Sequence, residues 1–183
     1  MQKHTPPGQP TTTDYGLGLK KVLYEKRAHI AYVTINNAER ENCLTEEVDH
    51  DLWRVWDDFR DDRELYVAIL TGAGRKAFCS GSDLRYYVEK LARQSPEWNR
   101  RRALEGPNLG GITKGINVWK PIIAAINGYC LAAGMELAMA CDIRIAADHA
   151  MFGVANRRWN VGAESGLTQR LPHIVGLGVA LDL

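Results

Sequence analysis

The sequence lacks any apolar run long enough to cross a membrane, although 45% of its 183 residues are hydrophobic. Its first residues contain neither the hydrophobic region of a signal peptide nor the Arg-rich amphipathic pattern of an organelle transit peptide. These absences favour a cytoplasmic protein without a membrane partner.

An excess of charge of one sign is also missing, because 23 Lys and Arg residues face 22 Asp and Glu residues and leave a net charge of +1. So small a charge creates no field that attracts nucleic acid, and we expect no nucleic-acid partner. The cysteines form no C-x-x-C pair, and no His stands at metal-ligand spacing from them. We therefore expect no metal site and reduced, buried thiols at Cys130 and Cys141, which lie in apolar runs.

The glycine-rich fingerprints G-x-G-x-x-G and G-x-x-x-x-G-K-[ST] are absent as well, which argues against dinucleotide and P-loop sites. The sequence does contain alternating strand and helix patterns. Short β-rich or apolar runs predict strands at 22–24, 30–35, 65–70, 121–126 and 143–147. Thr45 is placed to cap a helix whose apolar residues fall on one face. We expect an α/β domain over residues 19–183, preceded by a flexible Pro-, Thr- and Gly-containing tail over residues 1–18.

A turn of small residues, Leu131–Gly134, separates the strand before it from an apolar run that carries one charge, Glu136. Backbone N–H groups at such a strand–turn–helix junction are free to bind an anion or an oxyanion. A lone carboxylate is costly to bury without a task, although the helix dipole alone also accounts for an acid in the first turn. An acid or base beside an oxyanion hole predicts an enzyme.

Four segments, in this order along the chain, resemble motifs of the enoyl-CoA hydratase/isomerase (crotonase) superfamily. INNAERENCLTEEV is similar to the "LNRPEA-x-NAL" loop, and KAFCSGSDL to the "AF-x-A-G-x-D" segment. PIIAAINGYCLAAGMELAMACDIRIAADHAMFG resembles "KP-x-IAA-(I/V)-NG-x-x-x-GGG-x-EL-x-L-x-CD-x-x-(I/V)-A". LTQRLPHIVG resembles "GGTQRLPR-x-(V/I)G". The resemblance spans about residues 20 to 178.

The resemblance implies an α/β crotonase-like (ClpP/crotonase) fold, a spiral of ββα units around a site for an acyl-CoA thioester. It implies homotrimers or hexamers and no metal or redox cofactor, since CoA arrives as part of the substrate. Family members continue into a C-terminal helical region, which we expect to be missing from this shortened sequence.

The resemblance also places the site residues. The thioester carbonyl is expected between the backbone N–H groups of Ser80 and Ala133, and Glu136 matches the first glutamate of the hydratases. Further positions that match substrate-binding segments of the family are Gly81, Ser82, Asp83 and Gly134.

The second hydratase glutamate is replaced here by Asn156, which follows Phe152-Gly153-Val154-Ala155. An amide orients water or a hydroxyl but does not act as an acid or base near neutral pH. Glu164 is a candidate replacement, and helix capping explains it equally well.

Three functions follow from this set of residues. The first is hydration of an enoyl-CoA, with Glu136 moving the proton and Asn156 orienting water. The second is double-bond isomerisation, for which one carboxylate suffices as a proton shuttle. The third is a non-catalytic protein that binds acyl-CoA.

Overall fold

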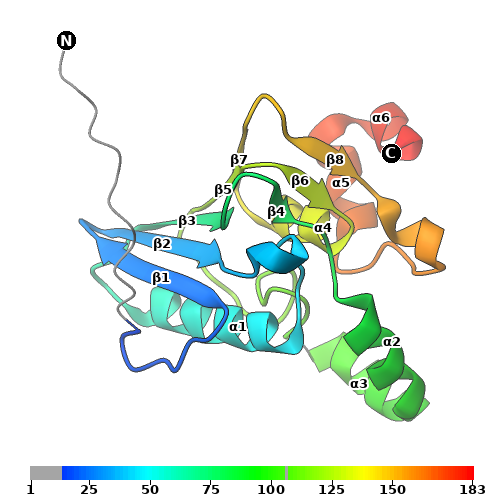
Figure 1. The fold of residues 1–183 in the computed structure, drawn as a ribbon, viewed down its shortest axis with the longest axis horizontal. Helices are drawn as coiled ribbons and strands as arrows, with labels where there is room; N and C mark the ends of the chain where they lie inside the picture. The colour runs from blue at the N-terminus through cyan, green and yellow to red at the C-terminus, as the bar shows by residue number, and fades with distance from the viewer. Residues whose placement is uncertain (1–13, 106) are drawn as a thin grey trace.

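The computed structural model of the protein describes residues 14–105 and 107–183 (Figure 1). Its strands are β1 (Val22–Arg27), β2 (Ile30–Ile35), β3 (Val67–Gly72), β4 (Ala77–Cys79), β5 (Ile122–Ile126), β6 (Tyr129–Leu131), β7 (Ile143–Ala146) and β8 (Met151–Gly153). Its helices are α1 (Glu46–Asp61), α2 (Leu84–Arg93), α3 (Pro96–Glu105), α4 (Ala133–Ala140), α5 (Leu167–Val175) and α6 (Leu177–Asp182), with short 3-10 helices η1 (Ala38–Arg40) and η2 (Ala155–Trp159).

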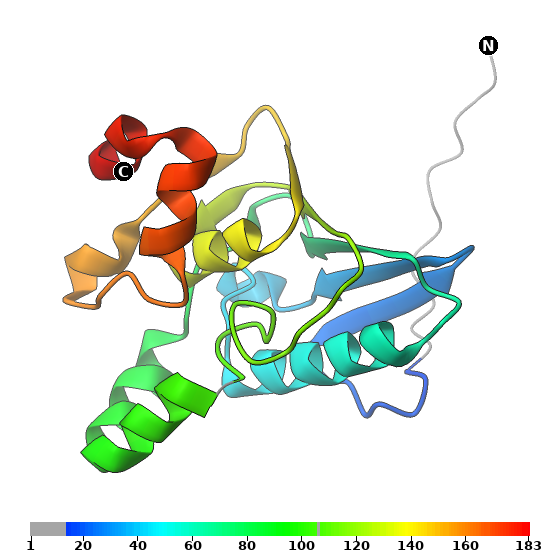
Figure 2. The ribbon, with the colours of Figure 1, turned by 180° about the vertical axis from the view of Figure 1, so that it is seen from behind.

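The strands form two sheets, one with the order β1-β2-β3-β5-β7 and one with the order β4-β6-β8. The hairpin β1–β2 is antiparallel, and every other pairing is parallel. From β3 onward, each strand of the first sheet is followed along the chain by a strand of the second sheet and then by a helical segment. The chain therefore advances as three stacked ββα units, which confirms the predicted spiral (Figures 1 and 2).

The predicted hairpin and the helix after Thr45 are both confirmed. In β2, every second residue is buried, and in α1 one face is buried, as the apolar spacing indicates. The Thr45 side chain accepts a hydrogen bond from the Val48 N–H at 3.3 Å and caps α1. The buried residues of the α1 face are Val48, Asp49, Asp51, Leu52, Val55, Trp56 and Phe59.

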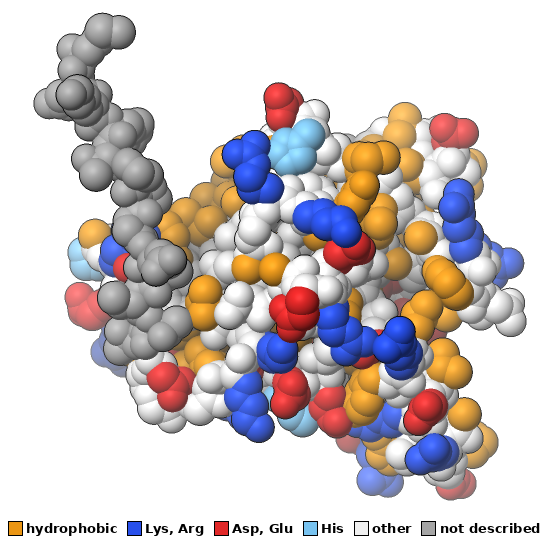
Figure 3. Space-filling model, viewed as in Figure 1, with side chains coloured by type: hydrophobic (Ala, Val, Ile, Leu, Met, Phe, Trp, Pro, Cys, Tyr) orange, Lys and Arg blue, Asp and Glu red, His pale blue; other side chains and the backbone are white. Residues whose placement is uncertain are grey.

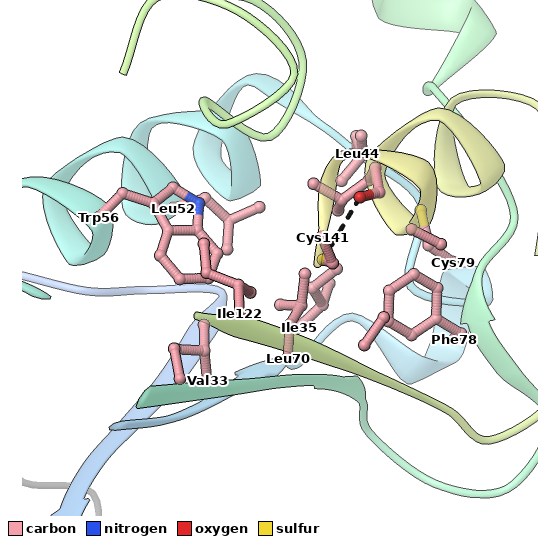
Figure 4. Packing of buried hydrophobic residues seen from close by; sticks show 14 of the residues in the cluster. Val33, Ile35, Leu44, Leu52, Trp56, Leu70, Phe78, Cys79, Ile122 and Cys141 are labelled. Carbon is pink, nitrogen blue, oxygen red and sulfur yellow. Dashed lines mark hydrogen bonds between the residues drawn. The ribbon is translucent and has the colours of Figure 1, made fainter. Parts of the chain in front are cut away.

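The core lies between α1, α4 and the first sheet. Trp56 and Leu52 of α1 pack above Val33 and Ile122 of the sheet, and Phe78 and Cys79 of β4 extend the same cluster toward α4 (Figure 4). The cysteines, Cys43, Cys79, Cys130 and Cys141, are all buried as free thiols. Burial raises the pKa of the Cys79 thiol to about 12, so that thiol is unreactive.

A buried carboxylate fastens the start of the first strand to α1. Asp51 is 1% exposed, and its Oδ2 accepts hydrogen bonds from the backbone N–H groups of Lys20, Lys21 and Val22. Upstream of these residues, the Gly18 N–H donates to Asp14 at 3.0 Å, and the Tyr15 hydroxyl accepts from the Lys26 N–H at 2.9 Å. Residues 14–18 of the predicted tail thus make hydrogen bonds within the described chain, and residues 1–13 lie outside the described residues.

The surface of the last unit exposes apolar side chains among charged ones. Figure 3 shows hydrophobic side chains at the surface of the half of the molecule that carries β7, β8 and α6. Within residues 14–105 and 107–183, no helix has the length and apolar character needed to cross a membrane. The exposed apolar residues of these elements are Ile143, Ile145, Met151, Phe152, Leu177, Val179 and Leu181.

Candidate active site

The site is built around Glu136, the fourth residue of α4, whose side chain points into the protein and is 1% exposed. Its Oε1 accepts a hydrogen bond of 2.9 Å from the backbone N–H of Glu164 and one of 3.4 Å from Nδ2 of Asn156. Burial raises the pKa of this carboxyl group from 4.5 to about 7, the N–H and the amide lower it, and the nearby Glu164 carboxylate raises it. A group with this pKa both accepts and releases a proton near neutral pH.

Asn156 and Glu164 come to Glu136 from η2 and from the loop before α5. Asn156 is 7% exposed, and its Nδ2 also donates to the Gly162 carbonyl at 3.1 Å. Its Oδ1 is buried and has no hydrogen-bond partner within the described chain. The Glu164 side chain is exposed, whereas its N–H is directed inward. The structure therefore brings together the three residues that we predicted to be catalytic.

The N-terminus of α4 lies against the turn that follows β4. Ala133 is the first residue of α4, so its N–H has no acceptor within the helix. A side-chain carbon built on Gly81, whose φ is +112°, would lie 3.5 Å from the backbone N of Ala133. Gly134 packs on the last residue of β4, since a side-chain carbon there would fall 2.1 Å from the Cys79 carbonyl oxygen. Gly134 is thus required for close packing of α4 on β4.

Ser80 does not fill the expected role of oxyanion donor. Its N–H donates to the carbonyl of Glu41 at 3.1 Å and is already used. Two backbone hydrogen bonds join Leu44 to the turn. The Leu44 N–H donates to the Gly81 carbonyl, and the Asp83 N–H donates to the Leu44 carbonyl, so the bonds lie on either side of Ser82. In such a bridge the N–H of the central residue points to the opposite side. The Ser82 N–H therefore points away from Leu44.

Asp83 also differs from the expectation of substrate binding. Its carboxylate is 2.8 Å from the guanidinium of Arg40, and its Oδ1 accepts the Arg85 N–H at 3.2 Å. The side chain thus fixes the start of α2 and joins it to η1. Among the described residues, no group of three or more His, Cys, Asp or Glu side chains is placed to hold a metal ion.

Comparison with known proteins identifies the fold and the family. The crystal structure of an enoyl-CoA hydratase from Mycobacterium tuberculosis superposes with a TM-score of 0.77 and 36% identity, over 89% of this chain and 60% of that chain. The structure therefore has the crotonase fold. The sequence profile of the family described as enoyl-CoA hydratase/isomerase matches residues 25–182. This chain belongs to that family.

Two relatives of known name show the extent of the match. The (E)-benzylidenesuccinyl-CoA hydratase of Thauera aromatica is 39% identical over 88% of this chain and 60% of that protein. The short-chain-enoyl-CoA hydratase of Clostridium acetobutylicum is 35% identical over 90% of this chain and 61% of that protein. The chain thus spans about three-fifths of the length of these relatives.

Two features of the site were missed at the level of sequence. Ala132, the residue before α4, has φ 49° and ψ −121°, a conformation that glycine adopts far more easily. Arg170 contacts the loop that carries Glu164. The first feature has a signal in the sequence, since an alanine stands where the family motif has glycine. The second also has a signal, since Arg170 is the arginine of the segment LTQRLPHIVG that matches a family motif, but its contacts with Ser165 and Thr113 are formed only in the fold.

Proposed function

We propose that this chain carries the catalytic centre of an enoyl-CoA hydratase. Such an enzyme adds water to the double bond of an enoyl-CoA thioester, or eliminates water in the reverse reaction. The observation that carries the proposal is the buried Glu136, whose carboxyl group has a pKa raised to about 7 and lies on the helix whose first N–H belongs to Ala133. Relatives named short-chain-enoyl-CoA hydratase and crotonyl-CoA hydratase support the same chemistry.

Two backbone N–H groups are proposed to hold the thioester oxygen, those of Ala133 and Ser82. The Ala133 N–H has no acceptor within α4, and the Ser82 N–H points away from the bridge with Leu44. Gly81, which has no side chain, lets the two segments pack closely. Charge develops on the thioester oxygen when water adds to the β-carbon. One preorganised donor of this kind lowers the barrier by about 3 kcal/mol.

Glu136 is proposed to move the proton. Its carboxylate takes a proton from water while the water oxygen bonds to the β-carbon, and the electron pair of the double bond moves into the thioester enolate. The resulting carboxylic acid then gives the proton to the α-carbon, so that water is added in full. Asn156, fixed by its bonds to Glu136 and Gly162, orients the water or the new hydroxyl group. Glu164 is the candidate for a second acid–base group.

A panel of enoyl-CoA substrates tests the proposal, with products separated by chromatography and the reaction run in deuterated water. Formation of 3-hydroxyacyl-CoA supports hydration. A shifted double bond without added water would identify the isomerase, which Asn156 in place of a second carboxylate also favours. Calorimetric binding of acyl-CoA without turnover would identify a non-catalytic binding protein. Glu136→Gln is expected to lower turnover by about 10²- to 10⁴-fold while acyl-CoA still binds.

We further propose that the protein works as a homotrimer or hexamer in the cytoplasm. Exposed Ile143 and Ile145 on β7 and Met151 on β8 support a covered surface on this side, since large apolar patches mark interfaces. The free thiols support a reducing compartment. Sedimentation velocity tests the assembly, and a strictly monomeric protein at micromolar concentration contradicts it.

A further inference from the structure

The loop between η2 and α5 is held by one side chain from the first turn of α5. The guanidinium of Arg170 donates from Nη1 to the carbonyl of Ser165 at 2.9 Å and from Nη2 to the carbonyl of Thr113 at 3.1 Å. It therefore joins a loop beside the site to a segment more than fifty residues earlier in the chain.

The carbonyl of Ser165 belongs to an unusual turn. Ser165 has φ 47° and the following Gly166 has φ 89°, so both residues are left-handed, which is unfavourable for serine. The guanidinium packs directly on Gly166, since a side-chain carbon there would lie 1.9 Å from Nη1 of Arg170. The residue before this turn is Glu164, whose N–H reaches Oε1 of Glu136 at 2.9 Å.

We propose that Arg170 is a positioning residue, which clamps the left-handed turn at Ser165–Gly166 and so holds the Glu164 N–H against the Glu136 carboxylate. Because Glu136 is the proposed acid–base group, this role rests on the proposed function.

The far end of the clamp is firmly anchored. Thr113 is 4% exposed, and its hydroxyl donates to the Leu109 carbonyl at 2.6 Å. The next carbonyl, that of Gly110, accepts from the indole N–H of the fully buried Trp56 at 2.8 Å. Arg170 thus transfers the rigidity of the core to the loop. The planar guanidinium of arginine donates to two carbonyls in different directions at once, whereas lysine offers a single ammonium group.

The charged groups on the elements around Glu136 are few. Glu164 lies in the loop, Arg157 and Arg158 are exposed on η2, and α5 carries Arg170 and His173. The turn after β4 adds Asp83, which is paired with Arg40, and the segment that holds Thr113 adds Lys114. Of these groups, the charged Glu164 carboxylate affects Glu136, and its charge raises the pKa of Glu136.

The direct test is the titration of the Glu136 carboxyl group by isotope-edited infrared spectroscopy, with the Glu136→Gln spectrum as the background. In Arg170→Met the turn relaxes and the N–H donor to the charged carboxylate is lost. The pKa of Glu136 is then expected to rise by about one pH unit, because that hydrogen bond favours the charged form. Arg170→Lys is expected to show a smaller rise.

A matched control is available on β7, the strand that follows α4. Arg144 donates to the carbonyl of Ala138 at 3.2 Å and to that of Asp142 at 3.2 Å, near the end of α4 remote from the loop. Arg144→Met removes comparable arginine–carbonyl bonds, so it is expected to lower the melting temperature without changing the Glu136 titration.

An unchanged Glu136 titration in a folded Arg170→Met protein overturns the positioning role, and so does an equal shift in Arg144→Met. If Arg170→Met does not fold, Arg170→Lys decides by the same measurement. The titration needs no substrate. An Arg170-dependent titration in a protein that turns over no enoyl-CoA would therefore refute the proposed function and leave the clamp intact.

Discussion

The backbone N–H of Glu164 donates a 2.9 Å hydrogen bond to Oε1 of Glu136, although the two residues are 28 positions apart in the chain. Glu164 therefore acts on Glu136 in two opposite ways. Its N–H stabilises the charged carboxylate and lowers the pKa, and its own carboxylate repels the charge and raises the pKa. Burial exceeds both effects, and substitution can separate them.

Glu164→Gln removes the repelling charge and keeps the N–H. We expect the pKa of Glu136 to fall, so the acidic limb of the kcat/KM profile moves to lower pH by less than about one pH unit. If Glu164 is instead a second acid–base group, the substitution lowers the maximal rate as well. Glu97→Gln, an exposed acid on α3, serves as the control and is expected to leave the profile unchanged. A shift to higher pH would contradict the assigned electrostatics.

The unmodified protein is expected to show hydratase activity that rises with pH through about pH 7, the pKa of Glu136. The direction follows from the proposed step, since the ionised carboxylate accepts the proton of water. Initial rates between pH 5 and 9, at substrate concentrations well below KM, report the free enzyme. A flat profile across this range would exclude Glu136 as the base.

Glu136→Gln is expected to stabilise the fold in alkaline solution. The folded pKa of about 7 exceeds the ordinary value of 4.5, so the native state binds the proton more tightly than the unfolded chain. The stability contributed by the protonated group is complete below pH 4.5 and is lost as pH rises to about 7, which amounts to about 3 kcal/mol. Urea unfolding of both proteins at pH 5 and pH 8 measures the difference. It should be larger at pH 8, and equal values at both pH values would refute the raised pKa.

Ala132→Gly is expected to increase the free energy of unfolding by about 1 kcal/mol. Alanine is strained at φ 49° and ψ −121°, whereas glycine adopts these angles without strain. The greater conformational freedom of glycine in the unfolded chain offsets part of this gain in stability. Ala147→Gly provides a control, since Ala147 has no positive φ and should lose stability on the same change. A destabilised Ala132→Gly protein would show that the methyl group contributes packing that outweighs the strain.

The parts of the fold that depend on local pattern were predictable. The alternation in β2 and the apolar face of α1 follow directly from sequence, and the family motifs predict that Glu136, Asn156 and Glu164 meet. Ser80 was predicted to be an oxyanion donor, but its N–H donates to the Glu41 carbonyl, which comes from a separate segment of the chain. No periodicity in the sequence encodes that contact.

The interactions that sequence could not predict join distant segments. The carboxylate of Asp83, which was predicted to bind substrate, is paired with Arg40, and nothing in either segment identifies the partner. The same holds for Arg170 and Thr113, which are 57 residues apart. Such contacts exist only once the sheets have stacked, so they follow from the fold rather than from any local preference.

Because the strands alternate between two sheets, the proposed site residues come from different ββα units. Ser82 follows the strands of the first ββα unit, Ala133 and Glu136 belong to the second, and Glu164 belongs to the third. A shift of one unit by two residues along its neighbour would keep the same side chains facing the core but would separate the proton carrier from its donors. Turnover is therefore a stricter measure of correct strand register than compactness or helix content, and partly assembled molecules are expected to be inert.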